Sequence, residues 1–420
     1  MREMKDSGIS WVGEIPKEWS VNRAKYCFVN TKEIAGCMSD RYERLALTMN
    51  GVIKRSKDDS NGLQPEKFET YQILRPDELV FKLIDLQNVS TSRVGLSPYL
   101  GLVSPAYIIL KSNKRVLPAF AEKYFLMLWK NQIFNALGDA GVRSNLNSKD
   151  LLELSIPFPT FDEQQQIADF LDRECGKIDG LKADIQAQID TLEQYKRSVI
   201  TEAVTHGLNP SAPMKDSGIP WVGEIPAKWA VLPIYCVYGE RRRKNVFGTE
   251  QNLLSLSYGK VIRKDINTNG GLLPSNYNGY NIIEKNDIII RPTDLQNDRT
   301  SLRTGLVKEH GIITSAYIAL KPKNRVSSKF YHYLLHSYDV KKVFYNMGNG
   351  VRQGLNYGEF AKLMVYYPPL DEQQEIADYL DNKCAEIEQI IADKKSQIET
   401  LDGYKKSLIY EYVTGKKEVV

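Results

Sequence analysis

The motif DEQQQIADFLD begins at Asp162 and opens a stretch without proline that continues to Thr205. The motif recurs near the C-terminus as DEQQEIADYLD, which begins at Asp371. Both copies keep a helical spacing of apolar residues, so the sequence predicts one long helix in two copies. At about 1.5 Å per residue, the first copy would be roughly 66 Å long. That length is far more than one small domain needs.

Prolines and acidic residues predict where each helix begins. Helix is excluded just upstream by Pro157 and Pro159 before the first copy, and by Pro368 and Pro369 before the second. We expect Asp162 and Asp371 to accept hydrogen bonds from the free N–H groups of the first turn. Their charge also suits the positive end of the helix dipole.

Apolar residues recur every seven positions along the first helix, and a similar line follows the second. A line this narrow is typical of paired helices, and the other copy is the nearest candidate partner. The predicted seam consists of Ile178, Leu181, Ile185, Leu192, Tyr195, Val199, Ile387, Ile390, Leu401, Tyr404 and Leu408. Because the two repeats follow each other head to tail, we expect antiparallel pairing. Gly176, Gly180 and Gly403 interrupt the helices and are interpreted as tolerated surface positions.

The composition is that of an ordinary globular protein, with 42% hydrophobic and 26% charged residues and a net charge of +4. This charge is too small to indicate nucleic acid by itself, so an anionic partner must be bound by local basic patches. No apolar run reaches the length of a membrane span, and the charged N-terminus does not look like a signal peptide. We therefore expect a cytoplasmic protein.

Five cysteines are present without a CxxC motif. By a constant offset, Cys27 and Cys175 match Cys236 and Cys384, which favours repeated buried thiols over disulfides or a metal site. His332 and His336 have the spacing of helical metal ligands, but Lys123 and Met127 stand at the same offset in the first half. No metal is predicted.

A second repeat lies ahead of the helices. MKDSGISWVGEIPKEW, from Met4 to Trp19, returns as MKDSGIPWVGEIPAKW, from Met214 to Trp229. The Gly-Glu-Ile-Pro turn in each copy sets the spacing of two tryptophans. We interpret each segment as a clamp that fixes a domain to a helix, rather than as a ligand site.

Between clamp and helix, each half shows alternating strand patterns, many turn residues and one shorter helical pattern. The predicted fold is α+β, with two similar mixed α/β domains at opposite ends of an antiparallel two-helix coiled coil and a pseudo-twofold internal repeat. The predicted boundaries are 1–157 for the first domain, 158–208 for the central helix, 209–367 for the second domain and 368–420 for the C-terminal helix.

Together, the helix motif PxxDEQQxIADxLD, the clamp SGIxWVGEIPxxW and the strings RPTDLQN and GIITSAYIAL resemble the specificity subunit of Type I restriction-modification systems. The resemblance covers nearly the whole chain. It implies two target recognition domains, each reading one half of a split DNA sequence, and helices that set their spacing and dock methyltransferase subunits. It also implies a restriction translocase-nuclease partner, and S-adenosylmethionine bound by the methyltransferase subunit rather than by this chain.

Candidate DNA contacts are basic clusters and polar loops, because Lys and Arg bind phosphates while Arg, Gln and Asn read base edges. They are Lys54, Arg55, Lys57, Gln87, Asn88, Arg93, Arg143, Arg241, Arg242, Arg243, Lys244, Arg263, Lys264, Gln296, Asn297, Arg299, Arg303 and Arg352. Charge runs can equally form solvated faces, and the Asn residues can equally serve turns.

Catalytic motifs are missing from the sequence. It contains no GK[ST] phosphate loop and no cofactor fingerprint after a strand, and Asn209 in NPSAP does not fit the methyltransferase pattern Asn-Pro-Pro-aromatic. We therefore predict a non-catalytic subunit. The alternative is a coiled-coil scaffold that does not read DNA, which would leave the two duplicated domains unexplained.

The likeness of the two halves predicts the form of the target. DLQN, GVR and the basic pair Lys54-Arg55 all recur in the second half. Similar surfaces related by a pseudo-twofold should read similar half-sites on opposite strands, as in dimeric DNA readers. We expect a split, near-palindromic target within about 19 base pairs, the span of a roughly 66 Å helix.

Overall fold

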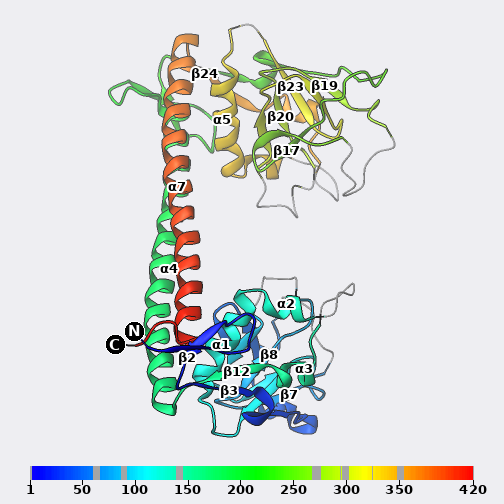
Figure 1. The fold of residues 1–420 in the computed structure, drawn as a ribbon. Helices are drawn as coiled ribbons and strands as arrows, with labels where there is room; N and C mark the ends of the chain where they lie inside the picture. Colours follow the sequence, from blue (N-terminus) through cyan, green and yellow to red (C-terminus); the bar gives the residue numbers. More distant parts are fainter. Residues whose placement is uncertain are drawn as a thin grey trace. The chain divides into compact units, whose positions relative to one another are not determined.

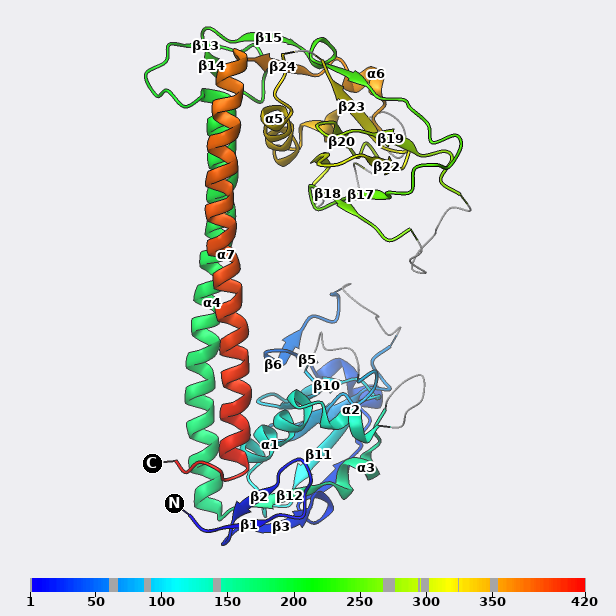
Figure 2. The same ribbon diagram turned by 45° about the horizontal axis from the view of Figure 1, so that its top comes forward.

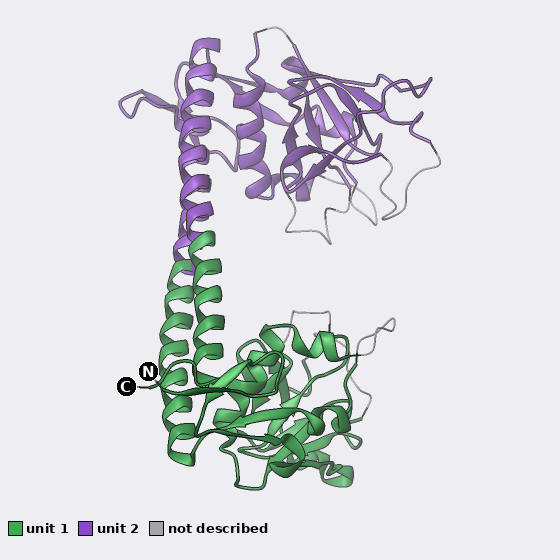
Figure 3. Cartoon of the chain, viewed as in Figure 1, with its two compact units in different colours: residues 1–185, 395–420 green, residues 186–394 purple. Residues whose placement is uncertain are grey.

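The computed structural model describes residues 2–59, 67–86, 92–138, 145–266, 276–293, 295, 302–323, 325–347 and 354–419 (Figure 1). The chain forms two compact units, residues 1–185 with 395–420 and residues 186–394 (Figure 3). Each unit contains one globular body and part of each long helix. Within the described residues, no helix combines the length and apolarity needed to cross a membrane.

The strands of the first unit are β1 (Met4–Asp6), β2 (Glu14–Pro16), β3 (Ser20–Arg23), β4 (Phe28–Thr31), β5 (Arg44–Thr48), β6 (Gly51–Arg55), β7 (Gln72–Leu74), β8 (Leu79–Phe81), β9 (Val94–Leu96), β10 (Gly101–Val103), β11 (Ile108–Ser112) and β12 (Ser155–Phe158). Its shorter helices are α1 (Pro118–Lys130), α2 (Ile133–Leu137) and α3 (Ser148–Glu153), and 3-10 turns lie at 24–26 and 36–41. Its two four-stranded sheets have the orders β6-β5-β10-β7 and β4-β11-β8-β9. The long helix α4 (Phe161–His206) begins in this unit.

The second unit has a similar plan, with strands β13 (Met214–Asp216), β14 (Glu224–Pro226), β15 (Ala230–Pro233), β16 (Tyr238–Glu240), β17 (Leu254–Ser257), β18 (Lys260–Arg263), β19 (Asn281–Ile283), β20 (Ile288–Ile290), β21 (Thr304–Leu306), β22 (Gly311–Ile313), β23 (Ile318–Pro322) and β24 (Met364–Tyr367). Its shorter helices are α5 (Ser328–Val340) and α6 (Tyr357–Phe360), and 3-10 turns lie at 234–236 and 343–346. The sheet β16-β23-β20-β21 corresponds to β4-β11-β8-β9. The long helix α7 (Leu370–Val413) begins here. The internal duplication is therefore confirmed for this sheet, whereas the counterpart of β6-β5-β10-β7 is divided into the two-stranded sheets β17-β18 and β19-β22.

The main core of each body lies between one sheet and one helix, and a smaller apolar cluster lies between the strands on the other face of that sheet. In α1, Phe120, Tyr124 and Leu128 are fully buried at helical spacing, which gives the helix one apolar face. Strand β8 is buried along its whole length, as is β20 with three consecutive isoleucines. Strands buried on both faces cannot show a polar-apolar alternation.

The clamp prediction is supported by matching contacts in the two units. The indole N–H of Trp19 donates to the Glu163 carboxylate at 3.4 Å, and that of Trp229 donates to Glu372 at 3.0 Å. Both tryptophans are buried. Each clamp therefore ties the start of a long helix to its own globular body.

The helix starts differ in detail from the prediction. Helix α4 begins at Phe161, and Thr160 caps it, because its hydroxyl accepts from the Glu163 N–H at 3.3 Å while Glu163 accepts from the Thr160 N–H at 3.1 Å. This reciprocal pair is a capping box, so Thr160 rather than Asp162 takes the cap position.

The next residue of the DEQQ motif fixes the helix to the core. The buried Gln164 side chain accepts from the Leu117 N–H at the start of α1 and donates to the Pro159 carbonyl. Gln373 makes the equivalent bonds to the Ser327 N–H and the Pro368 carbonyl. A buried amide with both ends satisfied explains why this motif is repeated.

Helix pairing is seen separately within each unit. In the first unit, Lys182 reaches Asp402 at 2.5 Å and Lys405 reaches Asp179 at 2.6 Å. In the second unit, Lys196 pairs with Glu388, and Lys394 donates to Gln188 at 2.5 Å. In both units, later residues of α4 meet earlier residues of α7, so the expected antiparallel pairing is confirmed there (Figure 2).

The predicted seam is only half right. One line, which contains Ile178 and Val199 in α4 and Ile387 and Leu408 in α7, is buried, and Ile185, Leu192 and Leu401 are partly buried. The residues predicted for the second line are half exposed: Leu181 (53%), Tyr195 (50%), Ile390 (45%) and Tyr404 (57%). The second line instead follows the first by four residues. It contains the buried Ile189 and Ile391, together with Lys182, Lys196 and Lys405.

The glycines fall into two kinds. Gly176, Gly180 and Gly403 have open space where a Cβ would stand, which confirms them as surface positions. Gly415 follows the end of α7 with φ +71°, and a Cβ there would lie 2.4 Å from Pro16 of the first clamp. The C-terminal helix therefore ends against the N-terminal clamp, as the repeat predicts.

The constant offset misaligned two pairs of residues. Cys27 is buried, whereas Cys236 is exposed, and the buried counterpart of Cys27 is Val237, the residue that follows the equivalent 3-10 turn. Similarly, α1 and α5 are both 13 residues long, so His332 corresponds to Glu122 and His336 to Leu126, not to Lys123 and Met127. Single-residue insertions between the repeats account for both errors.

Candidate nucleic-acid interface

Part of the predicted DNA-binding set lies outside the described residues. These are Gln87, Asn88, Arg143, Gln296, Asn297, Arg299 and Arg352. The remaining residues divide into hairpin positions, a basic run after β16 and buried arginines.

In the first unit, basic residues gather on and after β6. Lys54 is exposed and pairs with Glu43 at 2.6 Å, and Arg55 pairs with Asp59 at 2.6 Å. Lys57 donates to the Ser39 carbonyl at 2.8 Å and lies over the Phe68 ring. These side chains line a surface depression of about 430 Å³, to which Arg41 also contributes.

The equivalent hairpin of the second unit carries Arg263 and Lys264. The Arg263 side chain is 71% exposed and forms a bidentate ion pair with Glu309, whose pKa is lowered by this contact. Lys264 is exposed. Surface ion pairs of this kind contribute little to stability, so these cations can exchange their carboxylate for a phosphate at small cost.

Glycines hold both hairpins close to the neighbouring sheet. A Cβ at Gly305 in β21 would lie 2.5 Å from Leu256 and 3.0 Å from Val261 of the β17–β18 hairpin. At Gly95 in β9, a Cβ would lie 2.6 Å from Leu47. Only glycine permits this approach, so the basic edge is presented by a hairpin packed on its sheet.

The basic run after β16 is divided in its roles. Arg242 and Arg243 are exposed and pair with Glu240 and Glu284, and Lys244 donates to the Gly279 carbonyl at 2.9 Å. Arg241 instead binds the buried Asp287 with two nitrogens at 2.5 and 3.0 Å. Arg241 is therefore a structural partner of a buried carboxylate and not a free basic group.

Arg93 and Arg303, which were predicted to contact DNA, are buried. The Arg303 guanidinium donates to the Thr293 carbonyl at 2.6 Å and to the Tyr345 hydroxyl at 3.3 Å. Arg93 donates to the Asp85 carbonyl, in the loop that corresponds to the one containing Thr293. This burial argues against a direct DNA contact in this conformation, because both side chains bind loop carbonyls inside their own units. The DNA contact of these two residues stays a prediction.

The sequence interpretation missed two exposed aromatic residues, Phe247 and Tyr258. Tyr258 has φ +45° and Gly259 φ +78° in the tight turn between β17 and β18. A Tyr-Gly pair between two alternating stretches is a hairpin signal and could have placed Tyr258 at a tip. It lies on the same hairpin as Arg263.

The chain has a duplicated two-domain architecture. Each of its two similar α/β units has a basic hairpin and contains part of both long antiparallel helices. The sequence model of the family described as Type I restriction modification DNA specificity domain matches residues 84–191 and 243–400. The chain therefore belongs to this family. It is a DNA specificity subunit of the Type I restriction-modification kind, which is a non-catalytic component.

Relatives and solved structures agree with this assignment. The chain is 23% identical over 442 residues to a putative type I restriction enzyme MjaX specificity subunit of Methanocaldococcus jannaschii, covering 97% of this chain and 96% of that protein. It is 21% identical to the StySPI specificity subunit of Salmonella potsdam, covering 85% and 81%. A solved chain from a study of complex assembly and conformational transition of the type I R-M system matches this chain with a TM-score of 0.69 and 12% identity. The match covers 96% of this chain and 99% of that chain, and it shows a likeness of fold.

Proposed function

We propose that each unit binds one half of a bipartite, near-palindromic DNA target. In this proposal the long helices set the spacing of the half-sites and dock methyltransferase subunits. Those subunits bind S-adenosylmethionine and methylate one adenine per half-site on opposite strands, and a translocase-nuclease subunit supplies cleavage. This chain contributes recognition alone.

The observation that carries the proposal is the matched pair of basic hairpins. Lys54 in β6 corresponds to Arg263 at the end of β18, and Arg55 corresponds to Lys264, the next residue. The two hairpins have the same strand register, because Lys54 pairs with Leu45 and Arg263 pairs with Leu254. Lys54 and Arg263 are both exposed and held by single surface carboxylates. Cations on equivalent edges suit two phosphate backbones of similar geometry.

Methylome sequencing of a host with and without this chain tests the proposal. We expect methylated adenines that depend on the chain, in a split motif whose two halves are reverse complements or differ at one or two bases. Two unrelated half-sites would contradict the symmetry but keep the bipartite target. A methylome that does not change would contradict the function itself.

The exposed apolar residues on the helices support partner docking. In the first unit, Asp179 and Asp402 lie on the flank of the helix pair nearest α1, where their charges act on Lys130. Leu181 and Tyr404 lie on the opposite flank by helical spacing and are half exposed. In the second unit, Tyr195 and Ile390 hold the matching positions. We call each pair a docking pair.

Two docking pairs predict two methyltransferase subunits per chain. Changing Leu181 and Tyr404 together to aspartate should remove one of them, because the partner would have to desolvate two carboxylates. Native mass spectrometry of the reconstituted complex should then show one methyltransferase subunit instead of two. The matched control is Gly176→Asp with Gly403→Asp, which adds the same charge to the same helices at open positions. Two retained subunits in the Leu181/Tyr404 variant would contradict this docking site.

A further inference from the structure

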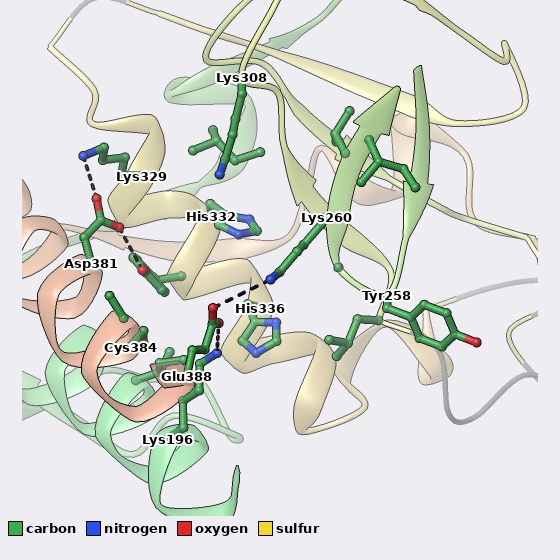
Figure 4. A pocket seen from close by; sticks show the side chains of 18 residues that line it. Lys196, Tyr258, Lys260, Lys308, Lys329, His332, His336, Asp381, Cys384 and Glu388 are labelled. Carbon is green, nitrogen blue, oxygen red and sulfur yellow. Dashed lines mark hydrogen bonds and ion pairs between the residues drawn. The ribbon is translucent and has the colours of Figure 1, made fainter. Parts of the chain in front are cut away.

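The second unit contains a cavity of about 470 Å³ that the proposed function does not use (Figure 4). Its walls come from α5, from the β17–β18 hairpin and from the parts of α4 and α7 that belong to this unit. The volume lies within the range of about 300 to 1,000 Å³ that is usual for small-molecule sites.

Two neutral histidines form one wall of the cavity. His332 and His336 lie one turn apart on α5, with ring centroids 6.5 Å apart. Burial lowers the pKa of His332 to about 3 and that of His336 to about 4, and nearby lysines act in the same direction. The His332 Nδ1 atom is buried without a hydrogen-bond partner in the described part of the chain. An unpartnered buried nitrogen is costly and calls for an explanation.

Positive charge exceeds negative charge around these rings. Four lysines line the cavity against two carboxylates. Lys196 and Lys260 both pair with Glu388, and the Lys260 ammonium lies 3.7 Å from its carboxylate. Lys329 pairs with Asp381 at 2.6 Å. Lys308 is exposed and has no ion-pair partner among the described residues. Its positive charge helps to lower the pKa of His332. In Figure 4 its side chain extends toward His332.

The first unit fills the equivalent place with its own carboxylate. Glu122, the counterpart of His332, accepts from the Leu96 N–H at 2.9 Å and pairs with Lys123 at 3.0 Å. Lys123 also reaches Asp172 at 2.5 Å. In the second unit Tyr333 replaces Lys123 and donates to Asp381, the counterpart of Asp172. The internal acid and base are therefore both lost, while the surrounding scaffold is kept.

We propose that this cavity binds a small organic anion, whose carboxylate or phosphate group lies between Lys308 and His332 where the first unit uses the Glu122 carboxylate. The remaining wall defines the rest of the ligand. Ile200, Val261, Leu302 and Leu306 line the cavity with apolar side chains. The ligand class is thus an anion with an apolar or aromatic body, rather than a bare inorganic ion.

Isothermal titration calorimetry on the full chain tests this site with acetate, benzoate and phenyl phosphate as probes. Benzoate and phenyl phosphate should bind saturably and more tightly than acetate, because only they cover the apolar wall. The stronger of the two tells whether the site favours a carboxylate or a phosphate. If neither probe binds above the level of acetate, the proposal is overturned.

The first unit supplies a matched variant. His332→Glu with Tyr333→Lys recreates the Glu122–Lys123–Asp172 arrangement beside Asp381, in a scaffold that already accommodates it. This double variant should keep the wild-type unfolding midpoint and bind the aromatic anions at least about tenfold more weakly, a loss of about 1.4 kcal/mol. Lys308→Ala changes an exposed side chain and should weaken binding similarly, so it decides the matter if the double variant does not fold. Unchanged affinity in the folded variants would overturn the site.

Discussion

Replacing Ile189 with aspartate is expected to destabilise the second unit by about 3 kcal/mol or more. Ile189 is 2% exposed and lies on the line of α4 that faces α7 within this unit, next to the Gln188–Lys394 hydrogen bond. Loss of a buried isoleucine side chain alone costs about 2 to 5 kcal/mol, and an unpaired buried carboxylate adds to that cost. Urea unfolding followed by far-ultraviolet circular dichroism should show an earlier transition.

Tyr195 provides the control on the same helix. It was predicted to lie in the seam but is 50% exposed, so Tyr195→Asp should change the free energy of unfolding by no more than about 0.5 kcal/mol. Equal destabilisation by the two substitutions would mean that the original seam, with Tyr195 inside it, is the correct one. The same reasoning applies to Ile391 and Ile390 in α7.

The reason for the seam error is physical. Leu181 and Tyr195 are apolar, whereas the residues that follow them, Lys182 and Lys196, are charged. A pattern search therefore prefers the apolar positions. In the structure the lysine stems lie along the seam while their ammonium groups reach Asp402 and Glu388 at its edge. A long basic side chain can occupy a half-buried position in this way, and the displaced apolar residues stay half exposed.

The duplication, the clamps, the antiparallel pairing and the order of elements could be predicted, because each depends on local pattern or on repetition. The hydrogen bonds of Gln164 and Gln373 could not, because their partners at Leu117 and Ser327 are distant in sequence. Exact pairing between the repeats also failed at Cys27, where one inserted residue moves the match to Val237.

The candidate site was harder to predict than the fold. Lys54 and Arg263 lie on exposed hairpins, where a basic residue on an alternating strand usually faces water, and their contact with DNA stays a prediction. Arg93 and Arg303 follow strongly polar loops, and nothing in the sequence distinguishes a buried arginine from a DNA-reading one. The difference lies in carbonyl groups that only the folded loops bring within reach.

The second large effect is expected at Arg303. Arg303→Met removes a buried guanidinium and its hydrogen bonds to the Thr293 carbonyl and the Tyr345 hydroxyl. This should destabilise the second unit by about 3 kcal/mol or more, since hydrogen bonds to a charged group are worth about 1.5 to 3 kcal/mol each. DNA affinity should then fall for all sequences together, and only where the variant is partly unfolded.

Arg263→Ala separates folding from DNA contact, because its side chain is exposed and its ion pair with Glu309 lies at the surface. The variant should keep the unfolding midpoint of the wild type while the slope of log affinity against log salt becomes shallower by about 0.9, the loss of one phosphate contact. Fluorescence anisotropy with a target duplex at several salt concentrations, beside urea unfolding of the same samples, measures both quantities. If Arg303→Met instead remained fully stable and relaxed the sequence preference at one base, then Arg303 would be a DNA-reading residue and its burial a feature of the unbound chain only.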